Sequence, residues 1–268
     1  MSHIKLKEIT IKRVVEAVGR RMANFPHLMA WNASGGLAGE NRKRLEQYRN
    51  KHAGERCFVI GNGPSIKKTD LSLLKNEVSF GANRLYLLFD EFNFLPTYYC
   101  SINGLVLEQF SKDLNELDLI KFYNWNYRHL FQANDKMLFI KGELGLKWDA
   151  FQPDITKPIG DGGTVTIASI HLAYFMGFKQ IVLIGVDHSF AEKGTPNKTV
   201  ENKSDDVNHF HPDYFPKGSK WQLPDFAKGE AAYHKIKEAF EADGREIIDA
   251  TIGGKLQVFR KVDYESLF

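Results

Sequence analysis

Residues 58–65 of the chain, FVIGNGPS, combine an apolar run with a glycine-rich turn. The apolar run is typical of a buried strand in a parallel sheet. Gly61 and Gly63 then allow a tight turn and the close approach of a ligand to the backbone. Pro64 fits the first turn of a helix, and Ser65 adds a hydroxyl group there, so we count both among the candidate nucleotide-binding residues. A strand, a glycine turn and a helix start together predict backbone N–H groups that can hold a phosphate.

The same turn departs from two familiar nucleotide motifs. It is neither G-x-G-x-x-G nor G-x-x-x-x-G-K-[ST], so the sequence disfavours a standard dinucleotide site or a P-loop NTPase. Asn62 stands at the tip of the turn instead. We therefore expect a nucleotide-type site in which an amide side chain takes part.

Three further polar residues follow predicted strands. Asn83, Asn103 and Asp187 each come after an apolar segment, as Asn62 does. In an open α/β sheet, ligands bind outside the carboxyl ends of the strands. An asparagine amide both donates and accepts hydrogen bonds, which suits a ribose, a base edge or a sugar hydroxyl. Although Asn and Asp are common in turns, four of them at strand ends predict one shared binding site.

A second glycine turn precedes a predicted helix at residues 164–178. Thr164 is suited to cap that helix, which would leave the amides of Gly162 and Gly163 for a phosphate or a carboxylate. Asp161 in the same turn is a candidate ligand for a metal ion carried by phosphates. A plain helix-start turn without any ligand explains the pattern equally well.

Residues 191–225 predict a lid over a polar, anionic substrate, because they carry histidines, aromatic residues and lysines with little apolar periodicity. His188 precedes this segment, and His209 and His211 lie within it. Each is a candidate proton acceptor near neutral pH. His209 and His211 could also bind a metal, but no third His or Cys stands at a diagnostic spacing.

The elements that must position these residues alternate between strand and helix. The clearest strand is QIVLIG at residues 180–185, which follows the predicted helix at 164–178. The alternation predicts an α/β fold with a doubly wound, mostly parallel, Rossmann-like sheet. The other expected strands lie at residues 57–60, 77–80, 97–102, 120–123, 137–140 and 246–249, and the other expected helices at residues 70–74 and 227–242.

Residues 3–30 predict a basic amphipathic helix. Its polar side carries Lys12, Arg13, Arg20 and Arg21. Such a helix either packs on the domain or on a second subunit, which we favour, or lies on an anionic membrane surface. The apolar positions at near-helical spacing are Ile4, Ile11, Val14, Val15, Val18, Met22 and Phe25.

Charge and glycine content suggest the domain boundaries. Residues 32–40, NASGGLAGE, predict a glycine-rich break, and residues 41–53 predict a charged helix before the first strand. Residues 1–56 contain 12 Lys/Arg and 5 Asp/Glu, a net charge of +7, whereas the remainder contains 24 and 28, a net charge of −4. We therefore expect a basic helical appendage at 1–53 and a nucleotide-binding domain at 54–268.

The composition of the 268 residues is that of a globular protein, with 43% hydrophobic and 26% charged residues. Cys57 and Cys100 lie in apolar segments, so we expect buried, reduced thiols and a cytoplasmic protein. Neither an apolar signal core nor a run of about 18 apolar residues occurs, which disfavours secretion and membrane spanning. Nucleic acid binding is disfavoured because basic and aromatic residues are not interleaved on the main domain.

The run VIGNGPS, together with Asn83 in GANRLY and with Asn103, resembles two related protein groups. One is the bacterial sialyltransferase family that builds surface oligosaccharides. The other is the MptE-like superfamily, which is named for archaeal 6-hydroxymethylpterin diphosphokinase and includes many uncharacterised glycan-pathway proteins. GFKQIVLIGVD, which ends at Asp187, is a second and less specific matching block. The resemblance covers residues 57–105 and 160–190.

In the sialyltransferases, the glycine turn and the asparagines hold a CMP-activated acidic sugar, and a lid histidine is the general base. The base of that family comes shortly before the last helix, where this chain reads WQLPDFA without a histidine. His188, His209 or His211 would have to replace it. The resemblance implies that the ligand is held by Gly61, Asn62, Gly63, Ser65, Asn83, Asn103 and Thr164.

The residues and the resemblance favour an inverting glycosyltransferase that joins a CMP-activated acidic sugar to a glycan acceptor in bacterial surface glycan synthesis. A lid histidine would accept the proton of the acceptor hydroxyl, and Asp187 would position the ribose, the acceptor or the base. This interpretation requires no further cofactor. We expect a homo-oligomer in the cytoplasm, at the inner face of the membrane if the N-terminal helix contacts lipid.

Two alternatives stay open. One is transfer of a diphosphate group from ATP to a hydroxymethylpterin-like substrate, with Mg²⁺ held by the phosphates and by Asp161 or Asp187. The other is a non-catalytic nucleotide-binding subunit of a glycan assembly complex. The scarcity of clustered carboxylates near the glycine turns favours the glycosyltransferase over the diphosphokinase.

Overall fold

The computed structural model of the chain describes residues 11–142, 149–191 and 194–268. Its centre is an eight-stranded sheet with the order β10-β9-β6-β1-β2-β3-β4-β5, in which all neighbours pair in parallel. The strands are β1 (Arg56–Ile60), β2 (Val78–Ala82), β3 (Tyr98–Ser101), β4 (Ile120–Asn124), β5 (Met137–Ile140), β6 (Gln180–Ile184), β9 (Glu246–Asp249) and β10 (Arg260–Lys261).

The chain builds one half of the sheet from β1 to β5 and then returns to place β6 on the other side of β1. This is the doubly wound arrangement, so the predicted fold class is confirmed. The seven strands expected from the sequence agree with the structure to within two residues at each end. Short β10 was not predicted, and neither was the antiparallel pair of β7 (Thr199–Glu201) and β8 (Lys220–Gln222).

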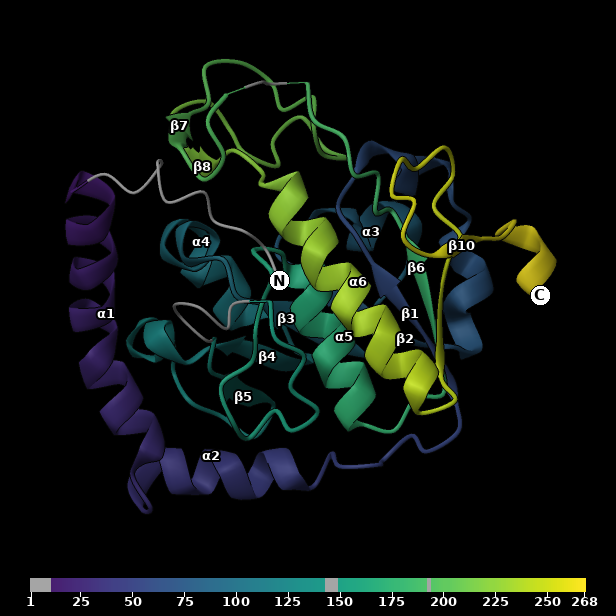
Figure 1. Cartoon of the computed structure of the whole chain (residues 1–268). Coiled ribbons are helices and arrows are strands. Elements are labelled where there is room, and N and C mark those ends of the chain that lie inside the picture. The colour runs from purple at the N-terminus through teal and green to yellow at the C-terminus, as the bar shows by residue number, and fades with distance from the viewer. Residues whose placement is uncertain (1–10, 143–148, 192–193) are drawn as a thin grey trace.

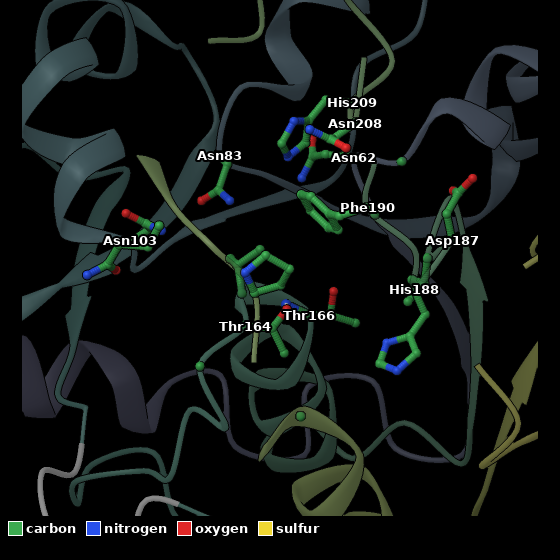
Figure 2. Close-up of a pocket in the computed structure, with 18 of the residues that line it drawn as sticks. Asn62, Asn83, Asn103, Thr164, Thr166, Asp187, His188, Phe190, Asn208 and His209 are labelled. Atoms are coloured by element: carbon green, nitrogen blue, oxygen red, sulfur yellow. The ribbon is translucent and has the colours of Figure 1, made fainter. Parts of the chain in front are cut away.

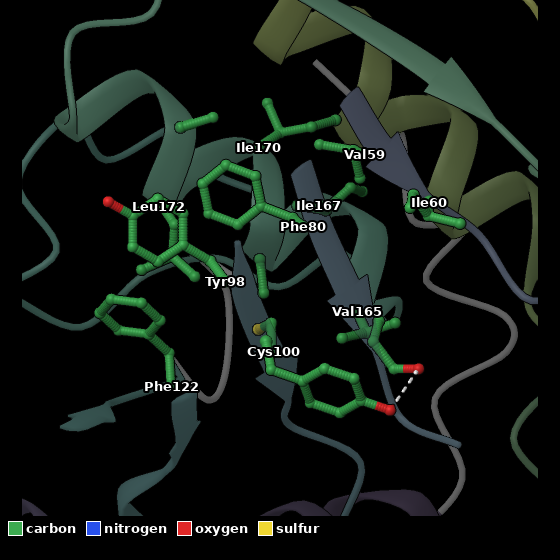
Figure 3. Close-up of a cluster of buried hydrophobic side chains, with 14 of the residues drawn as sticks. Val59, Ile60, Phe80, Tyr98, Cys100, Phe122, Val165, Ile167, Ile170 and Leu172 are labelled. Carbon is green, nitrogen blue, oxygen red and sulfur yellow. Dashed lines mark hydrogen bonds between the residues drawn. The ribbon is translucent and has the colours of Figure 1, made fainter. Parts of the chain in front are cut away.

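Helix α5 (Val165–Phe175) covers the centre of the sheet. It is apolar on all sides and almost wholly buried, as expected for a helix between a sheet and a further layer. Figure 3 shows the packing, in which Ile167 and Ile170 meet Val59 and Phe80 of the strands. Both cysteines are buried and unpaired, as predicted.

Three more helices surround the sheet. Helix α6 (Phe226–Ala242) lies beside α5 and contacts β9 (Figure 1). Helix α4 (Gly104–Glu116) follows β3, and the single turn of α3 (Phe89–Phe92) follows β2. The helix predicted at residues 70–74 is a 3-10 helix at Leu71–Asn76, where the Asp70 side chain accepts a hydrogen bond from the Ser72 N–H.

The N-terminal helices run around the β5 edge of the sheet (Figure 1). Helix α1 (Ile11–Asn32) is followed by α2 (Gly36–Glu46), so the predicted break at residues 32–40 is wrong beyond residue 35. The predicted helix at 41–53 is also wrong after residue 46, where turns replace it. The first turn of α2 contains small residues because it packs closely. Ala38 is buried, and a Cβ on Gly39 would collide with the Ser34 carbonyl.

Helix α2 closes the free edge of β5. The Asn41 amide donates to the Phe139 carbonyl at 2.9 Å and accepts from the Phe139 N–H at 2.8 Å. The Asn41 side chain therefore makes the two hydrogen bonds to the Phe139 backbone that a neighbouring strand would otherwise make. Among the described residues, no helix has the length and the apolar character needed to cross a membrane.

Candidate functional site

A cavity of about 380 Å³ opens at the carboxyl ends of β1, β2, β3 and β6. It therefore lies at the point where the strand order reverses, between β1 and β6, which is the usual ligand position in this architecture. The start of α5 forms its floor, and residues from 188–190 and 208–226 form much of its wall. Figure 2 shows Asn103 and Asp187 on opposite sides of the cavity. The predicted strand-end residues Asn62, Asn83, Asn103 and Asp187 all line it.

The amides of Gly61 and Gly63 already have backbone partners, so they are not free for a phosphate, which corrects the prediction for these two glycines. The Gly61 N–H donates to the Ile184 carbonyl at 2.7 Å, and the Gly63 N–H donates to the Gly185 carbonyl at 2.9 Å. A Cβ on Gly61 would lie 2.3 Å from the Gly185 oxygen. The glycines thus allow two neighbouring strand ends to approach each other, which sequence alone cannot distinguish from the approach of a ligand.

Asp187 also has a structural partner. Its carboxylate accepts the Ser65 hydroxyl at 2.6 Å and the Ser65 N–H at 3.2 Å. A Cβ on Gly63 would lie 2.0 Å from the same carboxylate. Ser65 and Pro64, both predicted to contact the nucleotide, do not line the cavity. This corrects their roles: Ser65 holds Asp187, and Pro64 begins the 3-10 helix Pro64–Lys68.

The three asparagines differ in whether their side-chain oxygens already have hydrogen-bond partners in the protein. Asn83, in the left-handed region with φ of 52°, accepts from the Ser101 hydroxyl at 3.1 Å. Asn103 caps α4 by accepting from the N–H groups of Leu105 and Val106. The Asn62 Oδ1 is buried and has no hydrogen-bond partner in the described structure. Since an unpaired buried oxygen is costly, Asn62 is the residue that most needs a ligand donor.

The predicted N-cap of α5 is confirmed, because the Thr164 hydroxyl accepts from the Thr166 N–H at 3.3 Å. Gly162 and Gly163 have φ values of 56° and 80°, which favour glycine. The Gly163 N–H donates to the Asp161 carboxylate at 2.8 Å. The prediction that this amide is free for a ligand is therefore wrong. Burial raises the pKa of Asp161, and the Gly163 N–H and the positive charge of Lys228 oppose that rise.

The three candidate histidines have different surroundings. His209 lines the cavity, and its Nδ1 lies 2.8 Å from the Asp206 carboxylate. His188 lines the cavity too, but its Nε2 lies 2.9 Å from Glu230. The Nδ1 of His211 accepts from the Asp213 N–H at 3.0 Å, and this residue is not part of the cavity lining. Of the three histidines, only His209 lines the cavity and also has a ring nitrogen beside a buried carboxylate. The Asp206 side chain is 4% exposed, whereas that of Glu230, the partner of His188, is 49% exposed.

The environment of His209 is rigid and largely apolar. Its ring stacks on Tyr214 at a centroid distance of 4.0 Å and meets Phe190 edge to face. Burial alone would raise the pKa of Asp206, but hydrogen bonds from His209 and from backbone N–H groups outweigh it and hold that pKa below its ordinary value. Asp206 therefore stays ionised beside the imidazole.

The segment predicted as a lid packs on the domain over its described part, which is residue 191 and residues 194–225. Arg84 is buried, donates to the backbone carbonyls of Asp213 and Tyr214, and lies over the Phe110 ring. Sequence reasoning missed Asp206 as the partner of His209, although the i, i+3 spacing of the two residues was a usable signal. It also missed several residues that line this wall and the cavity floor. The missed lining residues include Phe190, Asn208, Tyr214, Trp221, Thr166 and Tyr233.

In the described part of the chain, no group of three or more His, Cys, Asp or Glu side chains is placed to hold a metal ion. Asp161 and Asp187, the predicted ligands under the diphosphokinase alternative, both accept hydrogen bonds from their own surroundings. The polar side chains that line the cavity are mainly amides and hydroxyls.

Comparisons with known proteins found a family model and a solved structure to which this chain is similar. A family model described as 6-hydroxymethylpterin diphosphokinase MptE-like matches residues 36–193, which is more than half of the chain. The solved structure of MAf glycosyltransferase from Magnetospirillum magneticum AMB-1 is similar, with a TM-score of 0.49 and 16% sequence identity. That match covers 88% of this chain and 40% of the other, so this chain spans less than half of that protein's length. None of the curated proteins matches significantly.

Proposed function

Because this chain belongs to the MptE-like family, we propose that it is a transferase whose substrate binds in the strand-end cavity. Specifically, we propose an inverting glycosyltransferase that uses a CMP-activated acidic sugar as donor and a glycan hydroxyl as acceptor. The observation that carries this proposal is the His209–Asp206 pair in the wall of the cavity.

The geometry of His209 suits a general base. With Nδ1 held by the Asp206 carboxylate, the ring carries its proton there and presents Nε2 as the acceptor. Nε2 takes the proton from the acceptor hydroxyl while the hydroxyl oxygen bonds to the anomeric carbon. The bond from that carbon to the phosphate oxygen breaks, and its electron pair leaves with CMP. Proton transfer of this kind typically contributes about 10²–10⁴-fold.

The start of α5 is the best place for the donor phosphate. Thr164, Val165 and Thr166 line the cavity at the amino end of an 11-residue helix. The Thr164 hydroxyl pairs with the Thr166 N–H, but the helix dipole and the first-turn amides that this cap leaves unpaired favour an anion there. The leaving phosphate gains negative charge as the sugar bond breaks, and the same helix end stabilises that charge.

Asn62 supports recognition of a nucleotide. Its buried Oδ1 accepts from no described residue, so a ligand that fits must bring an N–H or O–H group to it. The exocyclic amino group of cytosine and a ribose hydroxyl both meet this requirement. A base with a carbonyl at that point would leave two acceptors facing each other.

A binding experiment tests the nucleotide. Calorimetric titration with CMP, UMP and AMP should show binding of CMP, and Asn62→Ala should weaken it about 5- to 100-fold, as expected for one buried hydrogen bond. Asn76→Ala is the matched control, because Asn76 is exposed and outside the cavity. Unchanged CMP affinity in Asn62→Ala would contradict the assignment.

A turnover experiment tests the base. His209→Asn should lower kcat about 10²–10⁴-fold with little change in CMP affinity, whereas His211→Asn should leave both within about twofold. His211 is the control because it lies two positions away and outside the cavity lining. Equal losses in the two variants would rule out the role of His209.

The diphosphokinase described for the family model remains the second candidate, because the match itself carries that description. It would need ATP, with Mg²⁺ carried by the phosphates and by Asp161 or Asp187. Chelation with EDTA separates the two activities: it should abolish diphosphate transfer and leave an inverting CMP-sugar transferase largely active. Binding of CMP without turnover on any acceptor would instead favour a non-catalytic subunit.

A further inference from the structure

Helix α1 presents an uncovered apolar stripe. Five side chains at alternating spacings of three and four residues are exposed: Val15 (63%), Val18 (47%), Met22 (71%), Phe25 (60%) and Met29 (59%). Residues at this spacing lie along one face of a helix. Apolar side chains of this size, gathered on one face, mark a contact surface.

The opposite face of α1 holds the helix on the domain. Trp31 is buried and meets Trp125 edge to face at 5.2 Å, and the Trp125 Nε1 donates to the His27 carbonyl at 3.0 Å. Asn24 accepts from Lys141 at 2.8 Å and from Asn126 at 3.1 Å. Asn24, His27 and Trp31 share the inward face, so the apolar stripe points away from the sheet. Figure 1 shows α1 at the outer side of the molecule.

The charge on α1 indicates what the stripe contacts. The helix sequence contains Lys12, Arg13, Arg20 and Arg21 but only one acidic residue, Glu16. Arg20 and Arg21 are exposed. A helix with an apolar face and a basic polar face is the pattern that lies in the surface of an anionic bilayer.

A second copy of the helix fits this charge pattern poorly. Alternating spacings of three and four also suit a coiled coil, in which the positions flanking the seam carry charges of opposite sign. With the stripe as the seam, these flanking positions include Gly19, Arg21 and Pro26, and none between Val15 and Met29 is acidic. Two such helices would therefore form no ion pair along the seam, which a glycine and a proline also flank.

We propose that α1 docks this protein on an anionic lipid surface, with the stripe Val15, Val18, Met22, Phe25 and Met29 inserted among the acyl chains and with Arg21, which flanks the stripe, at the headgroups. The docking is independent of the transfer reaction proposed above.

Vesicle co-sedimentation of the full chain tests this proposal. We expect binding to vesicles of phosphatidylcholine and phosphatidylglycerol in equal amounts, and little binding to phosphatidylcholine alone. Phe25→Glu should weaken binding about tenfold or more, because the lost apolar contact is replaced by a repelled charge. Arg21→Gln should weaken it about fivefold, the value of one basic residue at the headgroups. Leu95→Glu is the control, because Leu95 is equally exposed (65%) on another part of the molecule.

Three outcomes would overturn the proposal. The first is the absence of vesicle binding by the unmodified chain, and the second is equal binding to neutral and anionic vesicles. The third is a dimer in sedimentation equilibrium that Phe25→Glu dissociates and Leu95→Glu does not, which would assign the stripe to a second copy. Thermal melting of each variant confirms that the surface changes leave the fold intact, and CMP titration reports the cavity separately.

Discussion

Individual polar residues of the cavity divide into those that hold the backbone and those that face the ligand space. The carboxylates of Asp187 and Asp161 accept hydrogen bonds from Ser65 and Gly163. Asn62 keeps an unpaired oxygen. A residue type at a strand end therefore does not reveal its role, because the same carboxylate can serve a ligand or a neighbouring loop.

The Asp206–His209 pair predicts a dependence of stability on pH. The pKa of Asp206 is lower in the folded protein than its ordinary value, since hydrogen bonds from His209 and the backbone outweigh the effect of burial. Its contribution is fully present above the ordinary carboxyl pKa and is lost as the pH falls through the lowered folded value. Asp206→Asn should lower the free energy of unfolding at neutral pH by about 1–3 kcal/mol and flatten its decline in acid.

Urea unfolding between about pH 3 and about pH 7 measures this effect. Asp205→Asn is the matched control, because Asp205 is the exposed neighbour. If Asp206→Asn retained the full acid dependence of the unmodified chain, the pair would not contribute as described.

Among the elements, the turns after β1 and β6 form one unit. Each glycine-containing turn supplies carbonyls or N–H groups to the other, and Asp187 joins them through Ser65. This mutual support places Asn62 at the switch point between the two strands. The site therefore depends on the contact between the two turns.

Two glycine substitutions test this contact. Gly61→Ala should destabilise the protein by about 1–3 kcal/mol, because the new Cβ would meet the Gly185 backbone oxygen at 2.3 Å. Gly229→Ala should instead stabilise it by about 0.5–1 kcal/mol, since Gly229 lies inside α6 with open space around it. Urea unfolding measures the free energy of unfolding of both variants. If Gly61→Ala stabilised the protein as much as Gly229→Ala, the close contact between the two turns would not contribute to stability.

For the molecule as a whole, the N-terminal helices belong to the hydrophobic core. Trp31 at the end of α1 and Leu45 of α2 are buried in the same cluster as the strands. Helix α2 completes the β5 edge through Asn41. We therefore propose that residues 31–45 fold together with the sheet, and that the first part of α1 serves a separate purpose.

Trp31→Ala should destabilise the whole chain by about 3–5 kcal/mol, as expected when a buried tryptophan is removed from a core. Met29→Ala, two residues away and 59% exposed, should change the free energy of unfolding by less than about 0.5 kcal/mol. Chemical denaturation monitored by circular dichroism compares the two. A small effect of Trp31→Ala would mean that α1 docks only loosely.

Local patterns were sufficient to predict most of the fold. Parallel strands buried on both faces have continuous apolar runs, and the residues that end them are turn formers, so β1 to β6 and β9 are visible in the sequence. The glycine-rich segment that forms the start of α2 was misjudged because Ala38 and Gly39 serve close packing, which has no signature in a single sequence.

The sequence by itself determined the doubly wound sheet, the edge at which a cavity forms, and the asparagines that line it. Only the tertiary structure decided what each polar group does there. It paired Asp187 with Ser65, held His209 against Asp206, and left Asn62 unpaired. The physical reason is that strand formation depends on residues close in the chain, whereas a hydrogen-bond partner is chosen by distance and burial among residues far apart in it.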